Sequence, residues 1–423
     1  MAGGANSHTT VTDLVKGYKK KATKLYPAFK AMVEEFSWLD DISDEDITVS
    51  GRENLIPLDI RRGYGAHMVT DGGYEARTVT PAMAEGSFDF SELSARFYIS
   101  RRAKALDQRM AEAQIIRQIR YQSKKSMEAL ARRVGLNFYG NPDGVVCEST
   151  TNATATTQTL TLNDGFGDST IDTAPYLLGL FEVGDRVALL DPGASNALIT
   201  NALGEITSKT ADAIVVVFDG SVDADAADYV TFANGVTGAT IAETDGAKWQ
   251  PGLLAITTAS TLHGLATSSE PNWAAARNDT NGGRYGRAKL KADRQAIANA
   301  SGGKLSDVVW SQGVENDVEA GEAAGRIYDS SAFDLDQSVK AKGITFRTSQ
   351  LVPPGHVFAF DRTGWGKKLI TDKPAEDGTL DFGSAELYKA EDRSGFKGGF
   401  SFMWGQVCRS RGKFVRRAAV TES

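Results

Sequence analysis

The stretch GGFSFMWGQVCRSRGKFVRRAAV, residues 398–420, decides the fold of this chain of 423 residues. Its aromatic residues Phe400, Phe402 and Trp404 recur at every second position, which is the pattern of a β-strand with one buried face. Residues 398–423 alone cannot make a core for these side chains. We therefore expect the C-terminus to return to a sheet begun much earlier in the chain, and by the same logic residues 147–245 are an insertion.

Two upstream segments, residues 55–69 and 87–99, are predicted to be the strands of a long hairpin. The apolar residues of the second segment approach a period of two: Phe88, Phe90, Leu93, Ala95, Phe97 and Ile99. Glycines and Pro81 punctuate the polar tip between the segments. Because a two-stranded hairpin with little core is marginal by itself, we expect it to find its partner elsewhere, in another subunit.

Residues 101–138 form the longest predicted helix. One face is apolar, the other carries arginines, lysines and glutamines, and Gly135 and then Gly140-Asn141-Pro142 end the pattern. At 1.5 Å per residue such a helix spans roughly 50 Å, so we expect a strut lying on a sheet.

Before the hairpin, residues 11–25 have helical spacing with a lysine-rich face, and this arm should lie across another surface.

The elements predicted after residue 246 are mixed. Residues 286–300 and 312–324 have helical patterns, and Val308-Val309-Trp310 is a candidate for a buried strand. Strands are predicted over 343–351 and 356–361, with Pro353-Pro354-Gly355 as the turn between them. The chain therefore combines helices and strands in its last third.

Residues 141–245 differ in charge from both flanks. They hold 16 acidic residues against only Arg186 and Lys209, a net charge of −14 in a chain whose total is −7. Short strands without a helix are predicted here: 158–162, 185–191, 198–208, 213–220 and 228–234. This spacing is typical of a small all-β sandwich or barrel, and the change in charge marks a domain boundary. The acidic surface either keeps the domain soluble or helps to position a partner.

Composition excludes several classes of protein. No stretch approaches the ~18 uncharged apolar residues of a membrane span, and the N-terminus lacks the basic and apolar regions of a signal peptide. Two cysteines are too few for a disulfide framework, and Cys147 and Cys408 are expected to be buried small hydrophobes. With a pI near 5.4, sequence-specific nucleic-acid recognition is not expected.

Catalytic and metal-binding patterns are scarce. The four histidines are scattered, and none lies near a plausible Ser or Cys nucleophile in sequence: His8, His67, His263 and His356. Asp223, Asp225 and Asp228 resemble part of a calcium loop, but Ala226 and Ala227 follow where further features of that loop are required. A surface acidic turn is the better interpretation. We predict no enzymatic activity and no metal or cofactor site.

The order of these elements resembles the Hong Kong 97-type shell fold of the major capsid proteins of tailed double-stranded DNA phages. Three soft sequence patterns carry the resemblance: Trp249 to Trp273, with Gly252-Leu253-Leu254 and Pro271-Asn272-Trp273; Lys304-Leu305-Ser306-Asp307-Val308-Val309-Trp310; and Leu351-Val352-Pro353-Pro354-Gly355-His356-Val357-Phe358. The resemblance covers nearly the whole chain. It implies an α+β fold with a long spine helix, an extended β-hairpin, peripheral and axial domains, and an inserted small all-β domain.

The resemblance also implies domain boundaries: an N-terminal arm (1–54), an extended hairpin loop (55–100), a peripheral domain in three parts (101–146, 246–282 and 393–423), an inserted acidic β domain (147–245) and an axial domain (283–392). The implied function is a structural subunit that self-assembles into hexamers and pentamers of an icosahedral capsid around double-stranded DNA. Implied partners are further copies of the chain, a portal, separate scaffolding and cement proteins, and DNA through non-specific contact, with no membrane. The implied location is the virion, assembled in the host cytoplasm.

Charged residues of the hairpin and arm are candidates for ion pairs between subunits: Arg61, Arg62 and Arg77 with Asp40, Asp41, Asp44, Glu45 and Asp46. The alternative is that they are solvated, since exposed pairs contribute only ~0–1 kcal/mol each. In some relatives, an isopeptide bond between a hairpin lysine and an asparagine of a neighbouring subunit cross-links the shell covalently. Here no lysine occurs between Lys30 and Lys104, so we predict a shell held non-covalently. Since the segment before the hairpin is short, we expect no large cleavable scaffolding segment there and expect scaffolding, if used, to be a separate chain.

Two other functions remain open. The first is an encapsulin, a bacterial cargo compartment whose shell has the same fold. The second is a β-rich polysaccharide hydrolase acting through an acidic pair, which predicts a monodisperse monomer with a deep cleft. The inserted domain and the arm favour the viral shell over both.

Overall fold

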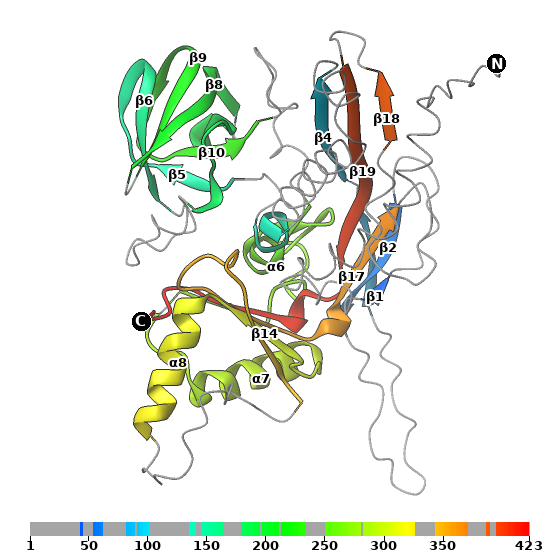
Figure 1. The fold of residues 1–423 in the computed structure, drawn as a ribbon. Helices are drawn as coiled ribbons and strands as arrows, with labels where there is room; N and C mark the ends of the chain where they lie inside the picture. The colour runs from blue at the N-terminus through cyan, green and yellow to red at the C-terminus, as the bar shows by residue number, and fades with distance from the viewer. Residues whose placement is uncertain are drawn as a thin grey trace, which may run out of the picture. The chain divides into compact units, whose positions relative to one another are not determined.

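The computed structural model of the chain (Figure 1) describes residues 43–44, 54–61, 82–88, 91–100, 135–140, 145–163, 179–194, 197–210, 213–233, 250–280, 282–325, 343–370, 386–389 and 395–422. The chain divides into two compact units. One comprises Met1–Ile42, Phe90–Gly135 and Leu369–Trp404, and the other comprises Ser43–Asp89, Leu136–Lys368 and Gly405–Ser423. Both units are therefore built from segments far apart in the sequence.

The C-terminal aromatic strand pairs with a strand from early in the chain, as its pattern predicted. Strand β19 (Gly395–Cys408) runs antiparallel to β4 (Ser91–Ser100), with Phe400 opposite Ala95, and β18 (Glu386–Lys389) also pairs with β19. The predicted strand over 87–99 thus exists, but its predicted place in the hairpin is wrong. Alternation of apolar residues identifies a half-buried strand without identifying its neighbour.

The hairpin consists of β2 (Asn54–Arg61) and β3 (Ala82–Phe88), which are antiparallel, with Ile56 opposite Gly86. Ile56, Leu58 and Ile60 form its buried face. A Cβ atom on Gly86 would lie 2.3 Å from Leu58 Cδ1 and 3.1 Å from His263 Cβ. The absence of a side chain at Gly86 therefore lets β2, β3 and His263 pack closely. The residues between β2 and β3, which include the predicted tip, lie outside the described residues.

Residues 147–232 form a closed barrel. Its strands follow the order β10-β5-β6-β9-β8-β7 around the barrel, and all neighbours are antiparallel. The bounds are β5 (Cys147–Ser149), β6 (Ala153–Asn163), β7 (Arg186–Asp191), β8 (Ala197–Lys209), β9 (Ala213–Ala224) and β10 (Asp228–Phe232), with a 3₁₀ turn η2 (Pro192–Ala194). Each of the five predicted strands corresponds to one of these. Closure removes the free strand edges that a small open sheet would expose.

A second, five-stranded sheet has the order β13-β20-β16-β14-β15. The bounds are β13 (Arg277–Asp279), β14 (Asp307–Trp310), β15 (Thr345–Thr348), β16 (Val357–Phe360) and β20 (Phe414–Arg417). The two predicted strands around Pro353-Pro354-Gly355 exist but are not adjacent, because β14 lies between them, parallel to β15 and antiparallel to β16. The sheet also pairs β13 and β20, which come from segments predicted as peripheral, with the strands of the predicted axial segment.

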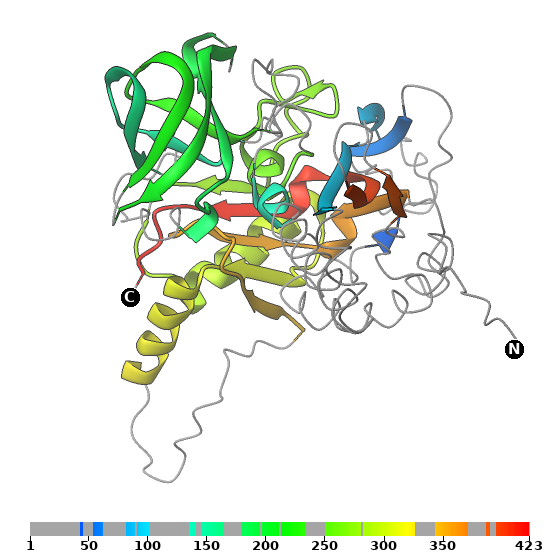
Figure 2. The ribbon, with the colours of Figure 1, turned by 45° about the horizontal axis from the view of Figure 1, so that its top comes forward.

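Helices α7 (Arg287–Ser301) and α8 (Gln312–Gly325) match the two predicted helices and cover the same face of this sheet (Figures 1 and 2). Ile297 from α7 and Val314 and Val318 from α8 pack in one buried cluster with Trp310 and Val357 of the sheet. Val308 and Val309-Trp310 are fully buried, as predicted. The apolar stripe of each helix therefore faces the sheet and its polar side faces away.

Short elements complete the described chain: β1 (Ser43–Asp44), α6 (Leu253–Thr258), β11 (Thr261–Leu262), β12 (Leu265–Ala266), η5 (Arg362–Gly364), β17 (Trp365–Ile370) and η6 (Arg411–Lys413). Of the predicted long helix, only the end is described: residues 135–139 are helical, and the Gly140 N–H donates to the Leu136 carbonyl at 3.0 Å. The basic arm over 11–25 and residues 101–134 lie outside the described residues. No helix in the described part of the chain combines the length and hydropathy needed to span a bilayer.

Candidate functional site

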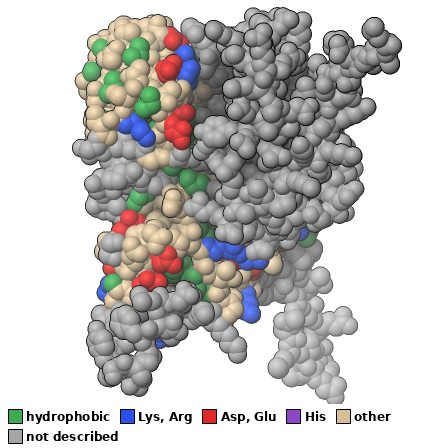
Figure 3. Space-filling model, in the orientation of Figure 1, with side chains coloured by type: hydrophobic (Ala, Val, Ile, Leu, Met, Phe, Trp, Pro, Cys, Tyr) green, Lys and Arg blue, Asp and Glu red, His purple; other side chains and the backbone are tan. Residues whose placement is uncertain are grey.

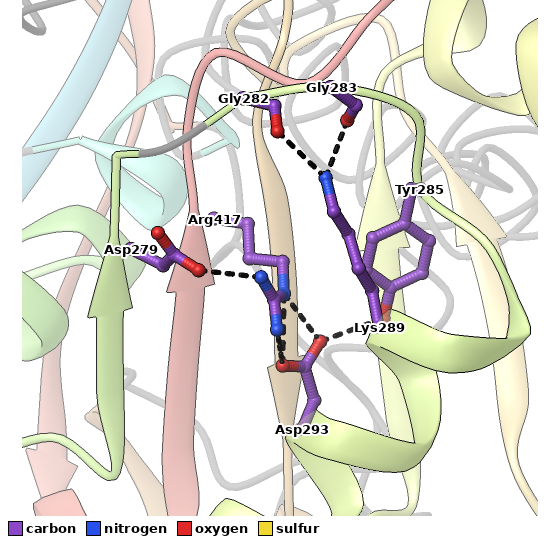
Figure 4. A network of polar contacts seen from close by, with 7 residues as sticks. All are labelled: Asp279, Gly282, Gly283, Tyr285, Lys289, Asp293 and Arg417. Atoms are coloured by element: carbon purple, nitrogen blue, oxygen red, sulfur yellow. Dashed lines mark hydrogen bonds and ion pairs between the residues drawn. The ribbon is translucent and has the colours of Figure 1, made fainter.

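A buried polar network joins the last strand to helix α7 (Figure 4). Asp293 is on α7 at a position that faces the sheet, and Arg417 is the last residue of β20. Arg417 donates from Nε to both Asp293 oxygens, at 2.9 and 3.0 Å, and from Nη2 to Oδ1 at 2.7 Å. The Tyr285 hydroxyl donates to Oδ2 at 3.1 Å. Arg417 Nη1 also donates to Asp279 Oδ2 at 2.7 Å.

The electrostatics of the network follow from its burial. The side chains of Arg417 and Asp293 are 5% and 0% exposed. Burial alone would lower the pKa of Arg417, but the hydrogen bonds and charge of Asp293 outweigh it, and that pKa lies above its ordinary value. Burial, together with the Asp293 charge, raises the pKa of Tyr285 well above 10. Near neutral pH, Tyr285 is therefore neutral and Arg417 is a cation.

Lys289 closes one side of the same network. Its Nζ donates to the carbonyl oxygens of Gly282 and Gly283, at 3.0 and 2.6 Å (Figure 4). Burial, and then the nearby Arg417 cation, lower the pKa of Lys289. Gly282 is required because a Cβ atom there would lie 1.8 Å from the Ala419 carbonyl oxygen.

This network holds structure together. The Asp293 carboxylate accepts hydrogen bonds from both Arg417 and Tyr285. An ion pair with satisfied hydrogen bonds is tolerated in a core, whereas removal of one partner leaves a costly buried charge. The network thus locks β20 against α7 and the loop before it.

Two further contacts fix the ends of the same sheet. At the start of β14, Asp307 accepts from Arg362 Nη2 at 2.7 Å and from Arg362 Nε at 3.2 Å. At the end of the chain, Glu422 accepts from the Gly355 N–H at 2.6 Å and from the Ser311 hydroxyl. Ser311 directly precedes α8, so the Glu422 carboxylate lies at the positive end of that helix.

The base of the hairpin is fastened to the rest of its own compact unit at His263. The Ser87 N–H donates to the His263 carbonyl at 3.1 Å, and the Cys408 N–H donates to His263 Nε2 at 3.0 Å. Burial lowers the pKa of His263 to about 4, which keeps Nε2 free to accept. The Asp59 N–H also donates to the Arg409 carbonyl at 2.9 Å. The hairpin base is therefore a fixed part of the subunit.

Most residues predicted to make contacts between subunits lie outside the described residues: Asp40, Asp41, Glu45, Asp46, Arg62 and Arg77. Asp44 is in β1, in register with Lys367 of β17, and Arg61 is the last residue of β2, in register with Ala82. The predicted ion pairs between subunits stay predictions. Sequence reasoning missed the pairs Arg417–Asp293 and Arg362–Asp307, and the only available signal was a charged residue at an otherwise apolar core position of α7.

The acidic turn that contains Asp225 and Asp228 is stabilised by a hydrogen bond within the turn. The Asp225 N–H donates to the Asp228 carboxylate at 2.7 Å, and Asp228 is 4% exposed. Burial, first of all, raises the pKa of Asp228. Within the described ranges, no group of three or more His, Cys, Asp or Glu side chains could hold a metal ion. On the face shown in Figure 3, acidic and basic side chains both lie on the barrel surface.

Comparisons with solved structures find chains of similar fold. The chain is similar to one in the Cyanophage A-1(L) capsid asymmetric unit, with a TM-score of 0.50 and 10% identity over 90% of this chain and 91% of that chain. Weaker likenesses are to a chain of Gordonia phage Cozz (TM-score 0.41, 12% identity, 92% and 87% covered) and to the holo-SrpI encapsulin complex from Synechococcus elongatus PCC 7942 (TM-score 0.42, 9% identity, 90% and 87% covered).

No protein-family model matches the sequence, and no curated protein does. At 10% identity the likeness to the cyanophage chain concerns the fold alone. The chain therefore has the mixed α and β fold of a phage capsid protein, which the resemblance in the sequence implied.

Proposed function

We propose that this chain is the structural subunit of a viral shell, assembling into hexamers and pentamers of an icosahedral capsid that encloses double-stranded DNA. The observation that carries the proposal is the likeness of fold to a phage capsid chain over 90% of this chain. The subunit acts in the virion after assembly in the host cytoplasm and is not an enzyme. Its partners are its own copies, a portal, scaffolding and cement proteins, and DNA through non-specific contact.

The hairpin supports assembly as the activity of this chain. One face of β2 and β3 packs on the subunit through Ile56, Leu58 and Ile60. The other face is exposed, and Met83 on it is 67% exposed. An apolar side chain held outward on a fixed hairpin base is available to a neighbouring copy. Burial of such surfaces between copies links folding to assembly.

The remaining assignments follow from the same proposal. The barrel of residues 147–232 is a domain inserted in the shell fold, the helix that ends at residue 139 is the spine helix, and the predicted peripheral and axial boundaries describe the rest. The shell is held non-covalently. An encapsulin is the second candidate, because its shell has the same kind of fold, and a polysaccharide hydrolase is the third.

Size-exclusion chromatography of the full chain, followed by negative-stain electron microscopy of the large fraction, tests the proposal. Hexamers, pentamers or closed particles are expected, and a monodisperse monomer would overturn it. Particles that contain an enzyme and no DNA would favour the encapsulin.

Mass spectrometry of boiled, reduced particles is expected to find single chains, and a covalent ladder through residues 55–100 would contradict the non-covalent shell.

A further inference from the structure

Helices α7 and α8 lie side by side on one face of the five-stranded sheet and carry opposite charge (Figures 1 and 2). The α7 sequence RAKLKADRQAIANAS has four basic residues, and its single acidic residue, Asp293, is bound to Arg417 in the interior. The α8 sequence QGVENDVEAGEAAG has four acidic residues and no basic one, and one of the four, Asp317, is paired with Arg284 at 3.0 Å. The helical layer therefore has a basic part beside an acidic part.

Three charged residues of the two helices are exposed. Lys291 and Arg294 are exposed on α7, and Glu319 is exposed on α8. Across the ranges that the structure describes, the side chains of these three residues make no ion pair. Lys291 and Arg294 are three positions apart. Residues three apart on a helix share one face.

Charge at the ends of the two helices does not favour their dipoles. The first turn of α7 has no acidic residue, its N-cap Gly286 has no side-chain hydrogen bond, and Arg287 and Lys289 place positive charge at the positive end of the helix. The last turn of α8 has no basic residue. Lys289 is bound to the carbonyl oxygens of Gly282 and Gly283, so it is not among the charges offered to a partner.

We propose that α7 of one copy faces α8 of the next copy, so that Lys291 and Arg294 pair with Glu319 of that neighbour. This inference rests on the proposed shell function and names the surface through which copies meet. Because two different surfaces meet, the contact runs head to tail, and such contacts close into rings when the rotation between copies allows it. Rings are the form that hexamers and pentamers take.

A second copy fits this surface better than nucleic acid does. A polyanion would be attracted to α7 but repelled by the acidic residues of the adjacent α8, and the whole chain has a net charge of −7. A second copy presents both signs in the complementary order. Charge complementarity of this type fixes the register and orientation of a contact more than it adds affinity.

Charge reversal in the full chain tests the pairing. The variants are K291E/R294E, E319K and the combination of all three changes, with E205K/K304E as a control that makes one change of each sign at exposed positions off the two helices. Each reversal on a single helix is expected to reduce the assembled fraction at least tenfold in sedimentation velocity at low salt. The triple variant is expected to regain assembly, and the control is expected to assemble like the wild type. Thermal unfolding of each variant identifies any that fails to fold.

The other outcomes separate this inference from the proposed function. If the wild type does not assemble, the shell function itself fails. If the wild type assembles and the K291E/R294E and E319K variants do so equally well, or if the triple variant is not restored, the pairing of α7 with α8 is overturned and the shell function stands. If K291E/R294E particles form normally but hold less DNA, the basic face serves nucleic acid and the pairing is likewise overturned.

Discussion

Arg417 and Asp293, 124 positions apart in the sequence, form a buried bidentate ion pair. The pair joins β20, the C-terminal strand of the chain, to helix α7. Both side chains are at most 5% exposed. The strand β20 is therefore held twice, by the backbone bonds of its neighbours β13 and β16 and by this side-chain lock. A subunit that meets many neighbours needs its segments fixed in one arrangement, and the lock provides this for the C-terminal strand.

Arg417→Met is expected to destabilise the subunit by about 3–5 kcal/mol, because it leaves the Asp293 carboxylate buried without a counter-charge. Urea unfolding of unassembled subunits measures the change. Lys304→Ala, at an exposed position, is the control and should change stability by less than about 0.5 kcal/mol. A loss below about 1 kcal/mol for Arg417→Met would mean that the pair does not carry this part of the fold.

Stability is expected to fall as the pH drops from 6.5 to 4, and His263 is one cause. Burial lowers the pKa of His263 from 6.5 to about 4. In this window the unfolded chain binds a proton that the folded chain does not, so acid favours unfolding by roughly 3 kcal/mol in total, and below pH 4 the effect levels off. His263→Asn removes the titration and suits the positive φ of 52°. Equal pH slopes for this variant and the wild type would contradict the assignment.

Gly252→Ala is expected to destabilise the junction between the helical residues 135–139 and α6. A Cβ atom there would lie 2.3 Å from the Asn137 carbonyl oxygen and 2.6 Å from that of Phe138, and backbone atoms cannot move aside cheaply. We expect a loss on the order of 1–3 kcal/mol. Gly179→Ala, where no atom lies within 4 Å, is the matched control in the same thermal unfolding assay. Equal melting temperatures for the two variants would show that the junction is loose.

Cys408 is expected to resist thiol reagents in the folded subunit. It is 1% exposed, and burial raises its pKa to about 12, so almost no thiolate forms at pH 8. Cys147 is 0% exposed and should also be protected. Labelling with a maleimide followed by mass spectrometry should modify both thiols only after denaturation. Rapid labelling of Cys408 in the native subunit would mean that the hairpin base opens readily.

The sequence predicted the elements of the last third well because their patterns are local. Residues 286–300 and 312–324 match α7 and α8 closely, and Val308 to Trp310 form a buried strand. The same patterns did not identify neighbours: the strand over 87–99 pairs with β19, and β14 separates β15 from β16. The contacts proposed for Arg61 and Asp44 depend on other copies, which a single chain does not contain.

By itself the sequence determined that the C-terminal aromatic strand must join a distant sheet, since alternating Phe and Trp side chains require burial that their own segment cannot supply. It also determined that the acidic segment is β-rich and separate in composition. Only the tertiary structure decided that β4 is the strand it joins, that the barrel closes, and that Arg417 meets Asp293. Periodicity records which face of an element is buried, whereas partner and register depend on packing between residues hundreds of positions apart.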